Sequence, residues 1–287
     1  MERPFVCHIP QNNPKPIIYS SPHSGRIYET SFLMQAALSF KEIRMSEDFY
    51  VDQLFATVIE TGSFFLEACF PRSFVDVNRS SDDLDHKLIA KSDTYRMSPR
   101  TAAGLGVIPR IVSDGIDIYD KKLSAEEVKW RLNNFYFPYH SKLRQLIDQA
   151  IENFGFAILL DVHSMPHNCL DHLADDKLGI PQIILGDCFG SSSTSNFSQQ
   201  VYDIFTSEGF NVRRNSPFSG GFITKNYGLP RQNVQAIQIE IDRSLYMDEQ
   251  NLILHSGFLN LRRKLQNIIY AISTIGLCES YFFQAAE

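Results

Sequence analysis

Residues 156–166 read FAILLDVHSMP, and the first six of them, Phe-Ala-Ile-Leu-Leu-Asp, decide the fold. A short apolar run that is almost continuous and ends in an acid is typical of a strand buried on both faces of a parallel sheet. Runs of the same kind occupy residues 16–20, 182–186 and 236–241. Segments with helical periodicity separate these runs. The alternation predicts an α/β fold with a mainly parallel, twisted, mixed sheet and helices on both faces.

The remaining predicted elements complete this pattern. Two further apolar runs predict strands at 63–70 and 74–77. Helical periodicity predicts helices at 47–60, 124–153, 196–207 and 248–275. Polar or serine-rich stretches predict loops at 11–16, 80–109 and 190–196. Ser124 and Glu127 have the spacing of a capping box, and Pro138 is expected to kink or divide the helix because it lacks a backbone donor.

The length and composition fit one domain over residues 1–287. The chain is 44% hydrophobic and 21% charged, which excludes the disordered, collagen-like and coiled-coil classes. The formal net charge of −6 and the pI near 5.8 argue against nucleic acid as a partner, because there is no basic field to displace counterions.

Five cysteines lie far apart and form no CxxC pair: Cys7, Cys69, Cys169, Cys188 and Cys278. An odd number at such spacing predicts reduced, mostly buried thiols in the cytosol. The sequence begins with no signal pattern, and no apolar run approaches the roughly 18 residues of a membrane span. We therefore expect a soluble cytoplasmic protein.

Polar residues follow or interrupt three of the predicted strands. Because ligands of open α/β sheets bind at the carboxyl ends of the strands, these residues are candidates for chemistry. His23 lies in a Ser-Pro-His-Ser-Gly turn after the first strand, and His163 lies one step past the predicted end of the central strand. Glu240 lies inside a later strand, where alternation places it on the same face as Gln238 and Asp242. A carboxylate in a core strand is costly unless another group pairs with it.

Two histidines and a carboxylate suit a zinc ion, since catalytic zinc sites take three nitrogen or oxygen ligands from the protein. The third ligand could come from residues 46–48, Ser-Glu-Asp, at the start of a predicted helix. Each residue also has a structural explanation: a packed histidine, a helix cap or a satisfied polar strand residue. Their expected convergence at one edge of the sheet favours the functional explanation.

Arginines supply the candidate cationic groups. Arg79 ends the predicted strand 74–77 and could bind a carboxylate through its planar fork, although the local sequence favours a salt bridge to Asp82, Asp83 or Asp85. The segment 104–110 has two glycines but lacks dinucleotide spacing, so we reject it as a phosphate motif. It could still bring Arg110 to a ligand.

Taken together, the motifs resemble the N-formylglutamate amidohydrolase family over about residues 17–270. The resemblance rests on PHSG (22–25), EDFYVDQLF (47–55), FVDVNR (74–79), PYH (138–140), LDVHSMP (160–166) and IQIEIDRSLYMDE (237–249). The family is similar to zinc carboxypeptidases and aspartoacylase. This similarity implies a single doubly wound α/β domain of the phosphorylase/hydrolase-like type with one catalytic metal.

The resemblance also implies roles for individual residues. His23, Asp48 and His163 correspond to zinc ligands, with Glu47 as the alternative to Asp48. The carboxypeptidase-like relatives have a glutamate ligand three residues after the first histidine, where this chain has Arg26.

Further roles concern catalysis and substrate binding. Glu240 corresponds to the general base and Asn78–Arg79 to the substrate-carboxylate clamp, which overturns the local preference for a structural Arg79. Arg79 or Arg110 is the expected oxyanion donor, and Arg79, Arg110 and Arg231 are the candidates for binding two substrate carboxylates. Asp161 is expected to orient His163 because alternation places both on one face.

The implied reaction is the zinc-dependent hydrolysis of N-formyl-L-glutamate to formate and L-glutamate, the last step of one route of histidine breakdown. Other divalent transition metals suit the same ligands. One alternative retains the zinc site but takes another N-acyl amino acid or a short peptide as its small-molecule substrate. A second alternative is a non-catalytic binding protein with the same fold.

Overall fold

The predicted central strand is β4 (Ala157–Met165) in the computed structural model, which describes residues 3–90, 98–112, 115–173 and 179–275. Strand β4 runs parallel to β2 (Ile17–Ser21) on one side and to β7 (Val234–Asp242) on the other. All nine of its residues are buried. His163 therefore lies within the strand, and the prediction that it follows the strand was wrong. The reason is that β7 pairs with β4 as far as Met165.

The seven-stranded sheet has the order β1-β3-β2-β4-β7-β5-β6. Strand β5 is antiparallel to β7 and parallel to β6, so the sheet is mixed but mainly parallel. The predicted α/β fold class is confirmed. The outer strands are β1 (Phe5–His8), β3 (Phe64–Ala68), β5 (Ile183–Gly186) and β6 (Val212–Arg214), and a separate hairpin consists of β8 (Met247–Asp248) and β9 (Ile253–Leu254).

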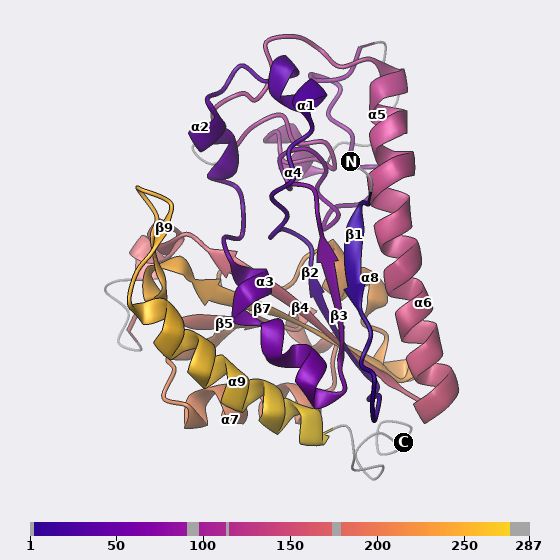
Figure 1. Ribbon diagram of the computed structural model, residues 1–287, viewed down its shortest axis with the longest axis vertical. Coiled ribbons are helices and arrows are strands. Elements are labelled where there is room, and N and C mark those ends of the chain that lie inside the picture. Colours follow the sequence, from indigo (N-terminus) through magenta and orange to yellow (C-terminus); the bar gives the residue numbers. More distant parts are fainter. Residues whose placement is uncertain (1–2, 91–97, 113–114, 174–178, 276–287) are drawn as a thin grey trace. The chain divides into compact units, whose positions relative to one another are not determined.

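Helices cover one face of the sheet with apolar side chains. Isoleucines 237, 239 and 241 of β7 and the matching residues of β4 pack with α3, α7 and α9 in one buried cluster. In Figure 1, α7 and α9 lie side by side along this face. The α-helices are α1 (Thr30–Gln35), α2 (Phe40–Arg44), α3 (Val51–Leu54), α4 (Pro99–Ala102), α5 (Ala125–Arg131), α6 (Phe137–Phe154), α7 (Ser195–Ser207), α8 (Phe222–Tyr227) and α9 (Gly257–Ile275).

The other face of the central strands is polar near their carboxyl ends. Side chains alternate along a strand, so residues paired in register share a face. Asp161 pairs with Gln238, and His163 pairs with Glu240. Helix α8 contacts β4 and β7, and the amide of Gly221, the residue just before the helix, donates a hydrogen bond to the Gln238 side chain on this face. The strand residues that the sequence analysis singled out for chemistry therefore lie on the face of the sheet opposite the isoleucines.

The chain groups into two compact units. One comprises Met1–Val6, Pro22–Glu47 and Glu67–Leu143, and the other comprises Cys7–Ser21, Asp48–Leu66 and Arg144–Glu287. The second unit holds β2, β4, β5, β6 and β7 with α3, α7, α8 and α9. The single domain over residues 1–287 remains a prediction.

Residues 47–60 do not form one helix as predicted. The backbone of Tyr50 is left-handed, with a φ of 57°, so α3 starts only at Val51. After Leu54 the chain continues as a 3₁₀ helix, η1 (Ala56–Thr61). The sequence of η1, ATVIET, is rich in β-branched residues, which lose side-chain freedom in an α-helix.

Two other predicted boundaries were wrong. Residues 74–77 form an irregular segment with turns at both ends rather than a strand. Phe74 donates its amide to the Pro71 carbonyl, and Asn78 donates its amide to the Asp76 side chain. All of these residues are buried, which explains the strand-like apolar pattern. The last helix begins at Gly257 rather than Asp248, because residues 247–254 form the β8–β9 hairpin.

The predicted helix 124–153 forms, with an interruption. Ser124 caps α5 by accepting the Glu127 amide, but the Glu127 carboxylate bonds Arg131 instead of closing a capping box. A π-helical segment, η3 (Leu132–Tyr136), separates α5 from α6 just before Pro138.

Four of the cysteines form no disulfide and are only half-buried, so the prediction of mostly buried thiols was wrong for them: Cys7, Cys69, Cys169 and Cys188. Cys278 lies outside the described residues.

Candidate metal centre and active site

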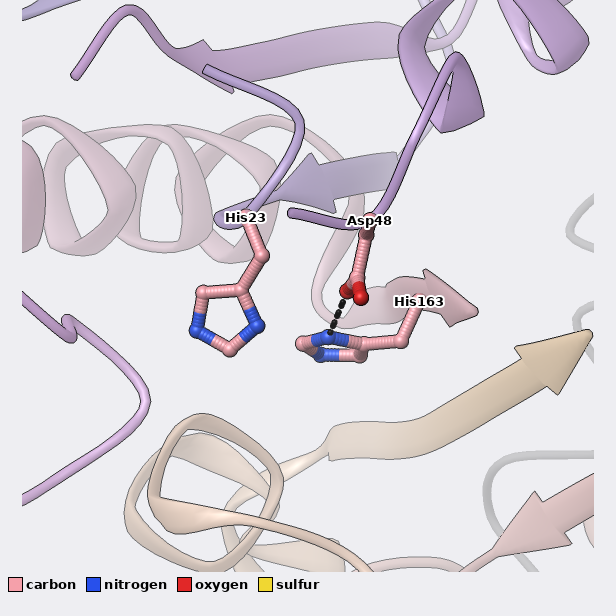
Figure 2. A group of neighbouring side chains, drawn as sticks. All are labelled: His23, Asp48 and His163. Carbon is pink, nitrogen blue, oxygen red and sulfur yellow. Dashed lines mark hydrogen bonds and ion pairs between the residues drawn. The ribbon is translucent and has the colours of Figure 1, made fainter. Parts of the chain in front are cut away.

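His163 lies between two buried carboxylates on the polar face of β4. Its Nδ1 is 3.0 Å from Asp48 Oδ2, and its Nε2 is 2.7 Å from Asp161 Oδ2 (Figure 2 shows the Asp48 contact). Asp161 is itself oriented, because its other oxygen accepts a 2.9 Å hydrogen bond from Ser20 on the neighbouring strand β2. The predicted contact between Asp161 and His163 therefore exists.

These carboxylates determine the charge of the imidazole. Burial disfavours the protonated form, but Asp161, Asp48 and Glu240 outweigh it and raise the pKa of His163 well above its usual value. An acceptor at each ring nitrogen is consistent with a ring that carries both protons.

Asp48 is held from its other side by Arg243. The Arg243 Nη2 is 3.0 Å from Asp48 Oδ1, and the Ser164 hydroxyl donates to the same oxygen at 3.4 Å. Arg243 is itself buried and also donates to Ser164. Together these contacts hold Oδ1 and turn Oδ2 toward His163.

Glu47, the alternative ligand, has different partners. Arg44 donates to both of its carboxylate oxygens, at 2.9 and 3.1 Å, and the Tyr28 hydroxyl donates to one of them at 2.6 Å. A carboxylate engaged this fully is a structural ion pair. Asp48 instead directs its Oδ2 toward His163 and lies within reach of both candidate histidines, so the geometry favours Asp48 over Glu47 as a metal ligand.

Glu240 lies beside His163 in the β4–β7 pairing. Its Oε1 accepts a 2.7 Å hydrogen bond from the Gln238 side-chain amide. Gln238, Glu240 and Asp242 share one face of β7, as predicted from the alternation, while the isoleucines face the core. Glu240 is thus a buried acid directly next to a candidate ligand.

His23 belongs to the other unit and follows β2 by two residues. Its Nε2 is 2.8 Å from Asp76 Oδ1. The turn that carries His23 requires glycine at position 25, where a Cβ atom would lie 2.1 Å from the Phe70 carbonyl oxygen. This contact explains the glycine of the PHSG motif.

Asp76 is the centre of a small ionic cluster. Arg72 donates to its Oδ2 at 2.8 Å, and Arg79 is 3.8 Å from the same oxygen. Burial disfavours the charged carboxylate, but Arg72, Arg79 and His23 together hold the pKa of Asp76 well below its usual value. Asp76 is therefore an ionised carboxylate that orients the His23 ring.

The predicted substrate arginines differ in their surroundings. The Arg79 Nε and Nη1 donate to the backbone carbonyls of Leu105 and Asn78, and its carboxylate partner is Asp76 instead of Asp82, Asp83 or Asp85. Arg110 forms ion pairs with Asp85 and Asp117.

Arg231 lies at the wrong end of β7 for a role beside Glu240. It is exposed in a 3₁₀ turn, η6 (Pro230–Gln232), that precedes the strand, whereas Glu240 is near the carboxyl end. The stretch of β7 between Val234 and Glu240 spans about 20 Å. This position argues against the predicted substrate contact. Arg26, at the relatives' glutamate position, is exposed.

His23, Asp48 and His163 (Figure 2) are buried donors that could together hold a metal ion. They offer two imidazole nitrogens and one carboxylate oxygen, which is a donor set of catalytic zinc. In each histidine a buried carboxylate contacts Nε2, as is usual for metal-ligating histidines, so Nδ1 is the nitrogen that could face a metal ion. The residues therefore fit the implied metal.

Four supporting residues received no role in the sequence interpretation: Asp76, Ser164, Gln238 and Arg243. Gln238 had a usable signal, because its place two residues before Glu240 in a strand puts it on the same face. Asp76 had no such signal, since its contact with His23 comes from a turn that looked like a strand.

Among the helices that the structure describes, none has both the length and the apolar character of a membrane span.

The fold and the polar face define the class of the protein: an α/β enzyme scaffold whose central parallel strands carry a buried cluster of acids and a histidine. The chain belongs to the N-formylglutamate amidohydrolase family, whose model matches residues 15–247.

Similar proteins agree with this assignment. The N-formylglutamate deformylase of Pseudomonas putida is 30% identical over 240 residues, which cover 82% of each chain. The crystal structure of N-formylglutamate amidohydrolase from Ralstonia eutropha superposes with a TM-score of 0.89 at 32% identity and covers 95% of this chain and 98% of that chain. The gene product Atu2144 from Agrobacterium tumefaciens, at 15% identity and a TM-score of 0.64 over 96% and 95% of the two chains, shares the fold.

Proposed function

We propose that this protein hydrolyses the amide bond of N-formyl-L-glutamate, a small-molecule substrate, to formate and L-glutamate. The supporting observation is that relatives named for this reaction share at least 30% of their residues with this chain over most of its length. The reaction would be the last step of one route of histidine breakdown, in the cytoplasm, as the family resemblance implies.

The proposal includes a zinc ion held by His23, Asp48 and His163. Support comes from the donor types and from the buried carboxylates that contact the Nε2 atom of each histidine. When bound, zinc supplies a lowered pKa for water and polarises a carbonyl group.

Glu240 acts in this proposal as the general base. It takes a proton from the attacking water and then delivers it to the departing amine nitrogen, so that formate and the free amino group of glutamate are produced. Its position next to His163 on the polar face of the sheet supports this role. Its burial supports it too, because a carboxylate shielded from bulk water is a more effective base.

Asn78 and Arg79 are proposed to bind a carboxylate of the substrate, and Arg110 is a further candidate. Arg79 is also the proposed donor to the oxyanion. Binding by Arg110 requires that a substrate carboxylate replace Asp85 or Asp117. Two cationic contacts are expected because N-formylglutamate carries two carboxylates.

The test is formate release from N-formyl-L-glutamate by zinc-reconstituted protein, with a chelator-treated control. We expect turnover that the chelator abolishes. The Glu240→Gln variant should retain zinc, measured by elemental analysis, and lose about 100-fold or more of kcat. Turnover that persists without metal contradicts the metal role, and an active Glu240→Gln variant contradicts the general base. Zinc-loaded protein that releases no formate contradicts the substrate.

A further inference from the structure

Gln238 forms two hydrogen bonds that link the proposed base to the backbone of a neighbouring loop. Its Nε2 donates to Glu240 Oε1 at 2.7 Å, and its Oε1 accepts from the Gly221 backbone amide at 2.6 Å. Gln238 as a whole residue is 4% exposed. Both hydrogen bonds are therefore shielded from water. In such a buried environment, hydrogen bonds contribute most to the positioning of a side chain.

The two bonds fix the orientation of the Gln238 amide. A backbone N–H only donates, so the group facing Gly221 must be the carbonyl oxygen of the side chain. The NH₂ group then necessarily faces Glu240. The network thus presents a donor, and not an acceptor, to the carboxylate.

Close packing of glycines places the Gly221 amide. Gly186 of β5 pairs with Gln238, and a Cβ atom on it would lie 2.6 Å from the backbone nitrogen of Gly220. Gly220 has a φ of +122°, and a Cβ atom there would lie 2.7 Å from the Cys188 sulfur. Only with glycine at both positions can residues 219–221 lie this close to the sheet.

We propose that Gln238 is a positioning residue that holds the Glu240 carboxylate in the orientation required for proton transfer, with the Gly221 amide as its fixed anchor. This inference rests on the proposed function, in which Glu240 is the base. Proton transfer requires that the orientation of the Glu240 carboxylate be fixed. The last torsion of a glutamate side chain has a broad, two-fold profile, so an unanchored carboxylate samples many orientations. Misplacement of a reacting group by about 1 Å can cost about 100-fold in rate.

Two variants test the inference in zinc-reconstituted protein with N-formyl-L-glutamate as substrate. Gln238→Leu removes both hydrogen bonds. Gln238→Glu retains an acceptor for Gly221 but replaces the donor to Glu240 with a carboxylate oxygen. We expect both to lower kcat by about 10- to 100-fold, the range for a hydrogen bond to a charged group, with little change in KM.

Gln235 provides a matched control. It is a buried glutamine of the same strand that also accepts a backbone amide, from Thr194 at 2.7 Å, but it lies near the amino end of β7. Gln235→Leu should change the thermal unfolding temperature to a similar extent and leave kcat within about two-fold. An equal kcat loss in both leucine variants would mean that strand damage, and not positioning, explains the effect.

A double-mutant cycle separates positioning from other roles. In the Glu240→Asp background the shorter side chain cannot make the same bond, so Gln238→Leu should lower kcat by less than about three-fold. Full additivity, or an unchanged kcat in Gln238→Leu alone, overturns the inference while the proposed function stands. A wild-type protein that releases no formate overturns both.

Discussion

The two histidines of the candidate metal centre are oriented in the same way. In each, Nε2 contacts a buried carboxylate: Asp76 for His23 and Asp161 for His163. Such contacts fix the ring orientation and raise the basicity of the nitrogen that binds the metal. The Asp161 contact could be predicted because the two residues alternate onto one face of a strand. The Asp76 contact could not, because it depends on how turn 74–78 folds back on the chain.

His167 provides a pH-dependent contribution to stability. Its Nδ1 is 2.8 Å from Asp242 Oδ2, and the hydrogen bond to this carboxylate raises the pKa of His167 above its usual value of 6.5. A pKa that is higher in the folded than in the unfolded state stabilises the fold fully below pH 6.5, and the contribution disappears as the pH rises through the folded value.

We therefore expect His167→Gln to lower the urea midpoint more at pH 5.5 than at pH 9. The side chain is 41% exposed, so solvent should keep the difference small. In the Asp242→Asn background the pH dependence of the His167→Gln effect should largely disappear. A larger effect at pH 9 than at pH 5.5 would contradict the assigned pair.

Strand β7 combines two periodic patterns in nine residues. One face carries the isoleucines of the core, and the other carries Gln238, Glu240 and Asp242. Strands β2, β3, β4, β5 and β7 were predictable because such apolar alternation or continuity is local. The short helices near residue 50 and the β8–β9 hairpin were not, since a left-handed Tyr50 and the pairing of distant backbone groups leave no periodic signal.

Helix α5 is anchored by a buried cation. Arg131 is fully buried, with its guanidinium 4.3 Å from the Phe74 ring centre and hydrogen-bonded to Glu127, Tyr119 and Gln35. Replacement by methionine retains much of the volume but removes the charge and its donors.

We expect Arg131→Met to lower the free energy of unfolding by about 3 kcal/mol, because it breaks a buried ion pair and a desolvated cation–π contact. Urea denaturation measures this change. Arg144→Met in α6 is the matched control: Arg144 is 43% exposed and 3.9 Å from Asp148, so the expected loss is below about 1 kcal/mol. Equal losses would show that the buried charge of Arg131 contributes no more to stability than the half-exposed charge of Arg144.

The molecule as a whole should be more stable with the proposed zinc ion bound than without it. A ligand that binds only the folded state stabilises it by about 2.7 kcal/mol at a free concentration 100 times Kd. For a chain of this size, each kcal/mol corresponds to about 2–4 °C in Tm. We expect chelation to lower Tm by about 5–10 °C in calorimetry and zinc to restore it.

The His163→Ala variant tests whether this effect arises at the proposed site. Its Tm should be the same with zinc and with chelator, whatever its absolute value. A variant that responds to zinc like the wild type would place the stabilising metal elsewhere.

The central position of β4 has a kinetic consequence. Strand β4 pairs along both edges, and all residues of β4 and β7 are buried. Amide hydrogens in such strands exchange with solvent mainly through opening of the whole sheet. Loss of the proposed zinc ion should therefore leave the strands that carry His163 and Glu240 intact. Uptake of zinc at the proposed site should then need no refolding, with a rate that depends on ion encounter, dehydration and proton release from the ligands.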